Sequence, residues 1–163
     1  MRSLLALGAN VGDREKHLRA GLAELDENGV RSIRCASLYY TEPKGLLSQP
    51  WFLNTVVEVE TTLEPEELMR ICLTVEQSRG RQRTVPNGPR ALDIDIILFG
   101  DRVIHSDILT IPHPQYTTRR FVLEPLAEIA SDTVDPVNGL KIETLLAEIS
   151  DESCVRLIGP PLV

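Results

Sequence analysis

The 163-residue chain lacks the features by which membrane proteins and secreted proteins are usually recognised in a sequence. None of its apolar runs approaches the ~20 residues that a helix needs to cross a bilayer. The apolar run near the start is interrupted at Gly8, so it is also too short for a secretory signal peptide. These absences argue against a membrane partner and predict a cytoplasmic protein.

Cysteine is scarce as well, because the chain contains only Cys35, Cys72 and Cys154. An odd number of widely separated cysteines argues against a disulfide framework, and no pair has the spacing of a zinc site. We therefore expect all three cysteines to be small, buried apolar residues.

Positive charge is in deficit, since the formal net charge is −7. A nucleic-acid-binding protein normally shows a basic face, so no nucleic-acid partner is expected. Residues 79–90 are the exception, because they contain four arginines and no acidic residue. A basic segment in an acidic chain indicates a small anionic ligand. The chain has neither GxxxxGK[ST] nor GxGxxG, so side chains and metal ions must hold any bound phosphates.

Hydrophobic periodicity predicts an alternation of strands and helices. The expected strands cover residues 2–7, 30–40, 53–59, 92–99 and 154–158, and the strand at 53–59 is predicted to be half-buried. Two helices are expected to begin near Asp13 and Pro65, and two more at residues 121–130 and 142–149. The order β-α-β-β-α-β with a helical tail predicts an α+β fold, ferredoxin-like, with a mixed or antiparallel sheet flanked by helices. Without repeats or linkers, residues 1–163 are expected to form a single domain.

Two aspartates stand in the strongest strand signal of the chain. In a strand, Asp93 and Asp95 lie on one face about 7 Å apart, with Ile97 and Phe99 further along that face. Two carboxylates at this distance repel by about 2 kcal/mol at an effective dielectric constant of ~20. Divalent cations relieve that repulsion, because they prefer carboxylate and phosphate oxygens. The alternative is that the aspartates form ion pairs with nearby arginines on a solvent-facing sheet.

The segment that contains these aspartates is similar to a known family signature. Residues 87–97, NGPRALDIDII, resemble the pattern GPR-x-x-D-[LIV]-D of the hydroxymethyl-dihydropterin pyrophosphokinases. Further blocks of the family pattern follow the same order at residues 7–10, 39–43, 49–54, 76–81, 111–114 and 119–123. The resemblance implies an ATP-dependent diphosphotransferase of folate biosynthesis. Such an enzyme moves pyrophosphate from ATP to the hydroxymethyl group of 6-hydroxymethyl-7,8-dihydropterin, giving AMP and the pterin diphosphate.

The same resemblance implies roles for the charged residues. Asp93 and Asp95 are implied to hold two Mg²⁺ ions that bridge to the ATP phosphates, and Asp93 also to face the pterin. Three arginines are implied to act with them in catalysis at the triphosphate: Arg81, Arg83 and Arg90. The residues implied to contact or support ATP are Glu76, Arg81, Arg90, His113 and Arg119.

For the pterin, the resemblance implies a flat ring held between Phe52 and Phe121. Asn54 is implied to bind the amide edge of that ring, with further contacts from Thr41, Glu42 and Lys44. The chain has only three phenylalanines, so two beside polar segments are informative. Either phenylalanine taken singly is typical of ordinary core packing.

Two alternatives remain open from the sequence. Another Mg²⁺-dependent phosphotransferase or phosphohydrolase could use the aspartate pair, but it would not need the aromatic sandwich. A non-catalytic module that binds nucleotide or pterin could also be built on a ferredoxin-like scaffold. In each case the partners are small molecules, and the chain is expected to be a monomer.

Overall fold

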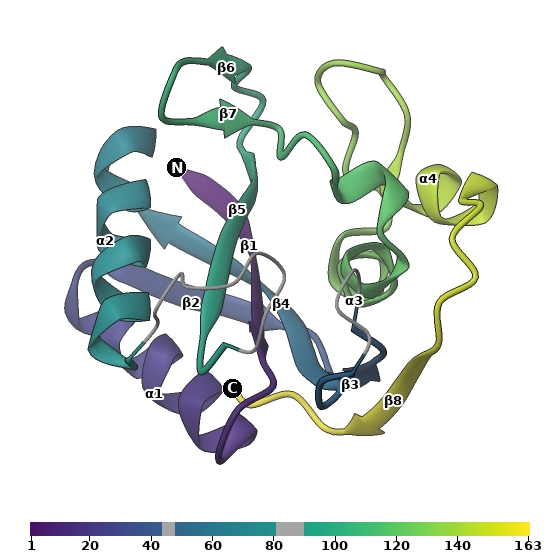
Figure 1. The fold of residues 1–163 in the computed structure, drawn as a ribbon. Helices are drawn as coiled ribbons and strands as arrows, with labels where there is room; N and C mark the ends of the chain where they lie inside the picture. The colour runs from purple at the N-terminus through teal and green to yellow at the C-terminus, as the bar shows by residue number, and fades with distance from the viewer. Residues whose placement is uncertain (44–47, 81–89) are drawn as a thin grey trace.

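A six-stranded antiparallel sheet forms the middle layer of the computed structural model, with helices on both faces (Figure 1). The structure describes residues 1–43, 48–80 and 90–163. The strand order is β5-β1-β4-β3-β8, and β2 also pairs with β4. The strands of this sheet are β1 (Arg2–Ala9), β2 (Val30–Cys35), β3 (Leu38–Thr41), β4 (Phe52–Thr61), β5 (Asp93–Phe99) and β8 (Val155–Gly159).

The helices and one small hairpin complete the fold. The helices are α1 (Arg14–Glu27), α2 (Pro65–Ser78), α3 (Arg120–Ala130) and α4 (Ile142–Glu148), with a short 3-10 turn at Tyr116–Thr118. The hairpin consists of β6 (Ile104–His105) and β7 (Thr110–Ile111). None of the helices in the described part of the chain is long and apolar enough to span a membrane.

The elements from β1 to β5 form a ferredoxin-like unit, which confirms the predicted fold class. Helices α1 and α2 cover one face of the sheet and enclose a cluster of buried leucines, valines and isoleucines. The first helix begins as predicted, because Asp13 accepts a hydrogen bond from the backbone N of Lys16 at 3.1 Å. Pro65 occupies the first turn of α2, where a missing backbone N–H costs no helical hydrogen bond.

Helices α3 and α4 cover the opposite face, and this second layer corrects one prediction from the sequence. The strand at 53–59 was expected to be half-buried, yet Val56 is fully buried. Its side chain belongs to a second cluster with Leu123 and Leu126 of α3. Alternation of apolar and polar residues therefore failed to indicate that both faces of β4 are covered.

A β-bulge corrects the expected faces of β5. Leu5 pairs with Ile96 and Leu4 with Leu98, so Ile97 is an extra residue in this strand. Beyond the bulge the side chains exchange faces. Ile97 and Leu98 both pack under α3, whereas Phe99 packs in the cluster under α1 and α2. Phe99 therefore does not share a face with the aspartates, contrary to the strict alternation predicted for this strand.

Two smaller expectations were also wrong. Residues 30–40 do not form one strand, because β2 ends at Cys35 and β3 begins at Leu38, although the backbone N of Ala36 still donates to the Val56 carbonyl of β4 at 2.8 Å. The backbone N of Ser37 donates instead to the Glu128 carboxylate of α3, at 2.9 Å. Cys154 is exposed, whereas Cys35 and Cys72 are buried as expected.

Candidate active site

A cleft of ≈ 960 Å³ lies along the edge strand β5 and brings the predicted site residues together. It is bounded by β1, β3, β4, α2, the β6–β7 hairpin and the start of α3. All predicted site residues that the structure describes line this cleft: Thr41, Glu42, Phe52, Asn54, Glu76, Arg90, Asp93, Asp95, His113, Arg119 and Phe121. The predictions for Lys44, Arg81 and Arg83 lie outside the described residues.

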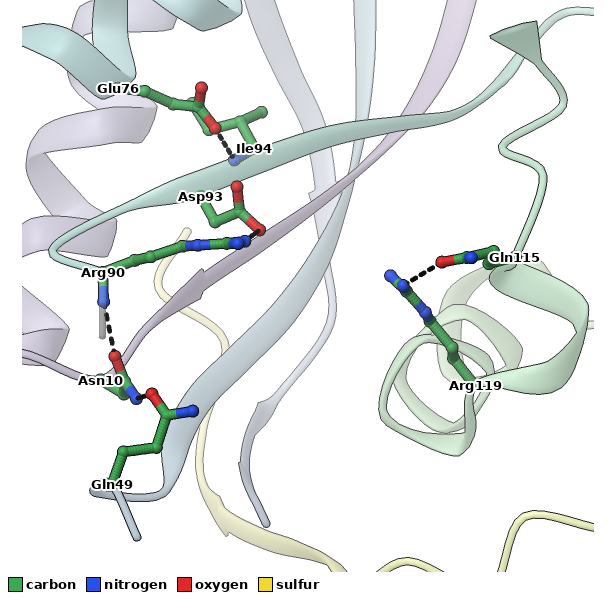
Figure 2. Close-up of polar contacts among 8 residues, drawn as sticks. All are labelled: Asn10, Gln49, Glu76, Arg90, Asp93, Ile94, Gln115 and Arg119. Carbon is green, nitrogen blue, oxygen red and sulfur yellow. Dashed lines mark hydrogen bonds and ion pairs between the residues drawn. The ribbon is translucent and has the colours of Figure 1, made fainter. Parts of the chain in front are cut away.

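The two aspartates enter the cleft from the beginning of β5. A carboxylate oxygen of Asp93 lies 3.0 Å from Nη1 of Arg90 (Figure 2). The ion-pair alternative is thus realised for Asp93, but inside a cleft and not on an open sheet face. An arginine beside the carboxylates also supplies the cation that a bound phosphate needs.

The acidic pair is suited to magnesium in its donor chemistry. Asp93 and Asp95 offer hard carboxylate oxygens, and both line the cleft. Within the described ranges, no group of three or more His, Cys, Asp or Glu side chains could hold a metal by itself. Magnesium fits a two-carboxylate site because it usually keeps water and substrate phosphates among its ligands. A closed structural zinc site needs four protein ligands and does not fit.

Glu76 supports the aspartate strand from helix α2. Its side chain is buried, at 2% exposure, and its Oε2 accepts a hydrogen bond of 2.8 Å from the backbone N of Ile94 (Figure 2). Ile94 stands between the two aspartates on the edge strand. Glu76 thus satisfies an outward backbone donor that is not paired by any strand in the described part of the chain, and it holds the aspartate strand in place.

Asn10 belongs to the family block at residues 7–10, and no individual role was predicted for it. It follows β1 and is 2% exposed. Its Nδ2 donates to Gln49 Oε1 at 2.9 Å, and its Oδ1 accepts from the backbone N of Arg90 at 2.8 Å (Figure 2). The same Nδ2 also donates to the carbonyl of Pro50 at 2.9 Å. The backbone N of Asn10 also donates to the Arg90 carbonyl at 3.0 Å.

A histidine and an arginine face the cleft from the segment before α3. The backbone N of His113 donates to the Ile97 carbonyl at 2.9 Å, and its Nδ1 accepts from the backbone N of Gln115 at 3.1 Å. Burial, and next the nearby Arg119 guanidinium, lower the pKa of His113 to about 4. The imidazole is therefore neutral at pH 7, and with Nδ1 accepting, its proton is on Nε2.

Arg119 is held in place by two neighbours. It donates a hydrogen bond to the Gln115 side chain (Figure 2), and its guanidinium lies 5.5 Å from the centre of the Phe121 ring. A cation over an aromatic face is a favourable contact. The arrangement fixes Arg119 and Phe121 relative to each other on the α3 side of the cleft.

The opposite end of the cleft is built from neutral groups. Asn54 Nδ2 donates to Thr41 Oγ1 at 2.6 Å, and both side chains are buried. A Cβ at Gly8 would lie 2.2 Å from Asn54 Oδ1, so only glycine leaves room for this amide. Phe52 and Phe121 line the same cleft from β4 and α3. Gly8 was not identified as a site residue from the sequence, although its place in a family block was the available signal.

Residues 151–154 clamp this end of the cleft from outside. The backbone N of Cys154 donates to Glu42 Oε1 at 2.7 Å, and the backbone N of Glu42 donates to the Cys154 carbonyl at 3.3 Å. Asp151 Oδ2 accepts from the backbone N of Arg120 at 3.0 Å and so caps α3. The carboxylate of Glu42, predicted to contact substrate, is thus bonded to the chain itself. No local pattern in the sequence indicated the role of Asp151.

An apolar lobe of the cleft was also missed from the sequence. Met69 and Leu73 of α2, Ile96 of β5 and Leu109 of the hairpin line it. In the sequence these residues are typical of core positions, and only the tertiary arrangement shows that they border a cleft.

The chain is similar in sequence and in fold to known proteins. A family model described as 7,8-dihydro-6-hydroxymethylpterin-pyrophosphokinase (HPPK) matches residues 4–131. The chain is 44% identical over 126 residues to the 2-amino-4-hydroxy-6-hydroxymethyldihydropteridine pyrophosphokinase of Bacillus subtilis, covering 77% of this chain and 75% of that protein. It is 41% identical over 161 residues to the protein of the same name from Synechocystis, covering 98% of this chain and 82% of that one.

Longer proteins match over only part of their length. The chain spans 20% of the folic acid synthesis protein fol1 of Pneumocystis carinii, to which it is 37% identical over 147 residues. It also matches a crystal structure of Plasmodium falciparum HPPK-DHPS A437G with STZ-DHP, with a TM-score of 0.75 over 90% of this chain and 45% of that chain. At 15% identity, the likeness to this structure shows the fold alone.

Proposed function

The chain belongs to the 7,8-dihydro-6-hydroxymethylpterin-pyrophosphokinase family, and on that premise we propose that it transfers pyrophosphate from ATP to 6-hydroxymethyl-7,8-dihydropterin. The hydroxymethyl oxygen attacks the β-phosphorus, the bond between the β-phosphorus and the α,β-bridging oxygen breaks, and AMP leaves. One observation carries the proposal: a single cleft joins an aromatic and amide end to an end with paired aspartates and arginine.

The pterin is proposed to lie between Phe52 and Phe121. Stacking on aromatic rings suits a flat heterocycle. Asn54 gives one amide hydrogen to Thr41, which leaves its second N–H and its carbonyl oxygen to pair with the amide edge of the ring. Since the amide cannot rotate without losing the bond to Thr41, it presents donor and acceptor in a fixed order.

ATP is proposed to occupy the rest of the cleft. The adenine base lies against the apolar lobe formed by Met69, Ile96 and Leu109, which offers the non-polar surface that a base requires. The phosphates then reach Arg90 and Arg119, whose planar guanidinium groups bind phosphate oxygens in pairs. The Nε2–H of His113 supplies a neutral donor at the same end.

Two magnesium ions are proposed to bind at Asp93 and Asp95. Bound there, they would neutralise phosphate charge and lower the pKa of the attacking hydroxyl. The chain's own contribution is to orient these carboxylates, through Glu76 at the outer edge of the strand and Arg90 just before it. Arg90 and Arg119 are fixed before the substrate arrives, so they stabilise the charge of the transition state with little reorganisation.

The experiment that tests this function is product analysis. The protein is mixed with ATP, Mg²⁺ and 6-hydroxymethyl-7,8-dihydropterin, and a matched reaction contains EDTA. AMP formed in step with pterin diphosphate, and absent with EDTA, is the expected result. ADP in place of AMP would indicate simple phosphoryl transfer or hydrolysis. Binding of both ligands without turnover would indicate the non-catalytic module.

The remaining expectations from the sequence are proposals of the same kind. We propose a monomer that acts in the cytoplasm on small molecules. Size-exclusion chromatography with light scattering checks the oligomeric state, and a mass of two chains would contradict it.

A further inference from the structure

Asn10 joins the two segments of the chain that flank the proposed substrates. On one side its side chain donates hydrogen bonds to Gln49 and to the Pro50 carbonyl, two residues before Phe52. Phe52 belongs to the pterin end, which is the end of the cleft where Thr41, Phe52, Asn54 and Phe121 are proposed to bind the pterin. On the other side it accepts a hydrogen bond from the backbone N of Arg90, whose guanidinium pairs with Asp93. Arg90, Asp93 and Asp95 form the phosphate end, which is the end of the cleft where the ATP phosphates are proposed to bind. The chain of contacts from Gln49 through Asn10 and Arg90 to Asp93 is continuous in Figure 2.

The bonding of Asn10 uses every polar group of its amide. Its Nδ2 donates both hydrogens, and its Oδ1 accepts one bond. The side chain is 2% exposed, so water does not replace a lost partner easily. An aspartate of the same shape would place an oxygen opposite two acceptors, Gln49 Oε1 and the Pro50 carbonyl. The site therefore selects asparagine by chemistry as well as by size.

We infer that Asn10 is a positioning residue for the proposed transfer, and that it sets the alignment of the pterin hydroxyl with the β-phosphorus. Transfer requires the reacting atoms to approach within roughly 3–3.5 Å, and a misplacement of about 1 Å costs on the order of 10²-fold in rate. Asn10 itself is not among the described residues that line the cleft. It holds the residues that bind one substrate at a fixed distance from those that bind the other. This inference rests on the function proposed above.

The test separates alignment from binding. The parent protein, Asn10→Ala and Gln49→Ala are compared for kcat, for the KM of each substrate, and for melting temperature. Asn10→Ala is expected to lower kcat on the order of 10²-fold, with each KM within about threefold of the parent. Gln49→Ala removes one of the three side-chain bonds and leaves Asn10 in place, so a smaller fall in kcat is expected from a folded protein.

A second readout uses the only tryptophan of the chain, Trp51, which follows Pro50. Loss of the Asn10 bond to the Pro50 carbonyl is expected to shift Trp51 emission in the ligand-free protein. Asn28→Ala is the matched control, because the Asn28 side chain makes an exposed hydrogen bond of 2.8 Å to the Glu24 carbonyl, away from the cleft. It should leave kcat and emission unchanged.

The outcomes distinguish this inference from the function on which it rests. If the parent forms AMP and pterin diphosphate while Asn10→Ala keeps kcat within twofold, the positioning role is wrong. A fall explained wholly by a raised KM for one substrate also overturns it. If the parent protein forms no AMP from ATP and 6-hydroxymethyl-7,8-dihydropterin, the proposed function itself is wrong, whatever Asn10→Ala does.

Discussion

The two ends of the cleft hold their side chains in place by different means. At the pterin end, neutral groups satisfy one another in a buried setting, where Thr41 is 1% and Asn54 8% exposed. At the phosphate end, the Arg90 and Asp93 side chains are 25% and 20% exposed and paired by charge. The first arrangement fixes a shape before any ligand binds. The second is a partly exposed pair of opposite charges, at the place where the phosphates and metal ions are proposed to bind. Mutations at the two ends should therefore have different effects, on kcat at the phosphate end and on pterin binding at the pterin end.

The largest effect is expected from Asp95→Ala at the phosphate end. Loss of a carboxylate proposed to bind Mg²⁺ would remove several kcal/mol of charge stabilisation, so kcat should fall by at least about 10³-fold. The fold should be retained, because the substitution relieves carboxylate repulsion. AMP release and a melting curve measure the two effects.

Asp107→Ala is the control for this prediction. Asp107 is exposed at the rim of the same cleft, and its loss should change kcat by less than twofold. Near-normal magnesium-dependent turnover in Asp95→Ala would contradict the proposed metal role.

The next effect is expected from Gly8→Ala at the pterin end. The added methyl group meets Asn54 Oδ1 at 2.2 Å and must displace the amide. Overpacking of this kind costs about 1–3 kcal/mol, which corresponds to a KM for the pterin raised roughly tenfold to a hundredfold. Binding of a non-hydrolysable ATP analogue, measured by calorimetry, should be unchanged.

Gly159→Ala provides the matched comparison for Gly8→Ala. An added Cβ at Gly159 has its nearest neighbour at 3.6 Å, an ordinary contact. If both glycine variants bind pterin like the parent, the Asn54 amide is not the recognition group.

A smaller effect is expected from Thr41→Val, which keeps the shape of the side chain but removes the acceptor for Asn54 Nδ2. One buried amide hydrogen loses its partner, at a cost of about 1–2 kcal/mol. Pterin affinity should weaken roughly tenfold while kcat changes little. Thr74→Val removes an exposed hydroxyl bonded to the Arg70 carbonyl on α2 and should have no effect on pterin binding.

The smallest effect is a pH dependence of stability at His113. Its pKa of about 4 in the folded protein lies below the ordinary value of 6.5, chiefly because of burial. Between these values the unfolded chain binds a proton that the folded protein does not. The stability due to neutral His113 is therefore present above pH 6.5 and is lost as the pH falls towards 4.

His113→Asn should reduce the fall in melting temperature between pH 6.5 and 4, by on the order of 2 °C. His105→Asn, at an exposed position on β6, should leave that slope unchanged. Equal slopes in the parent and in His113→Asn would show that burial of this imidazole does not govern acid stability.

Features that depend on neighbours in sequence were predictable. The i, i+2 spacing of Asp93 and Asp95 put both carboxylates in the cleft, and the cap at Asp13 marked the start of α1. The order of elements was enough to predict the ferredoxin-like unit, because its crossovers follow from the alternation of strands and helices. The roles of the individual site residues stay predictions until the variants are measured.

Features that depend on distant segments were not predictable. The bulge at Ile97 is set by pairing with β1, and it reversed the expected face of Phe99. Asp151 and Arg120 are 31 positions apart, so no local pattern shows that one caps the helix of the other. Asn10 makes hydrogen bonds to residues 39, 40 and 80 positions away, and these three partners become visible only when those segments are folded together.

The clamp made by residues 151–154 has a consequence for the synthesis of the protein. β1, β4 and β5 all leave the ribosome before these residues exist, so the sheet and its aspartates can form on the nascent chain. The cap on α3 and the partner of Glu42 arrive later, with the start of β8. The emerging chain therefore forms the aspartate end of the cleft first, and the Glu42 end is completed only after residues 151–154 have followed.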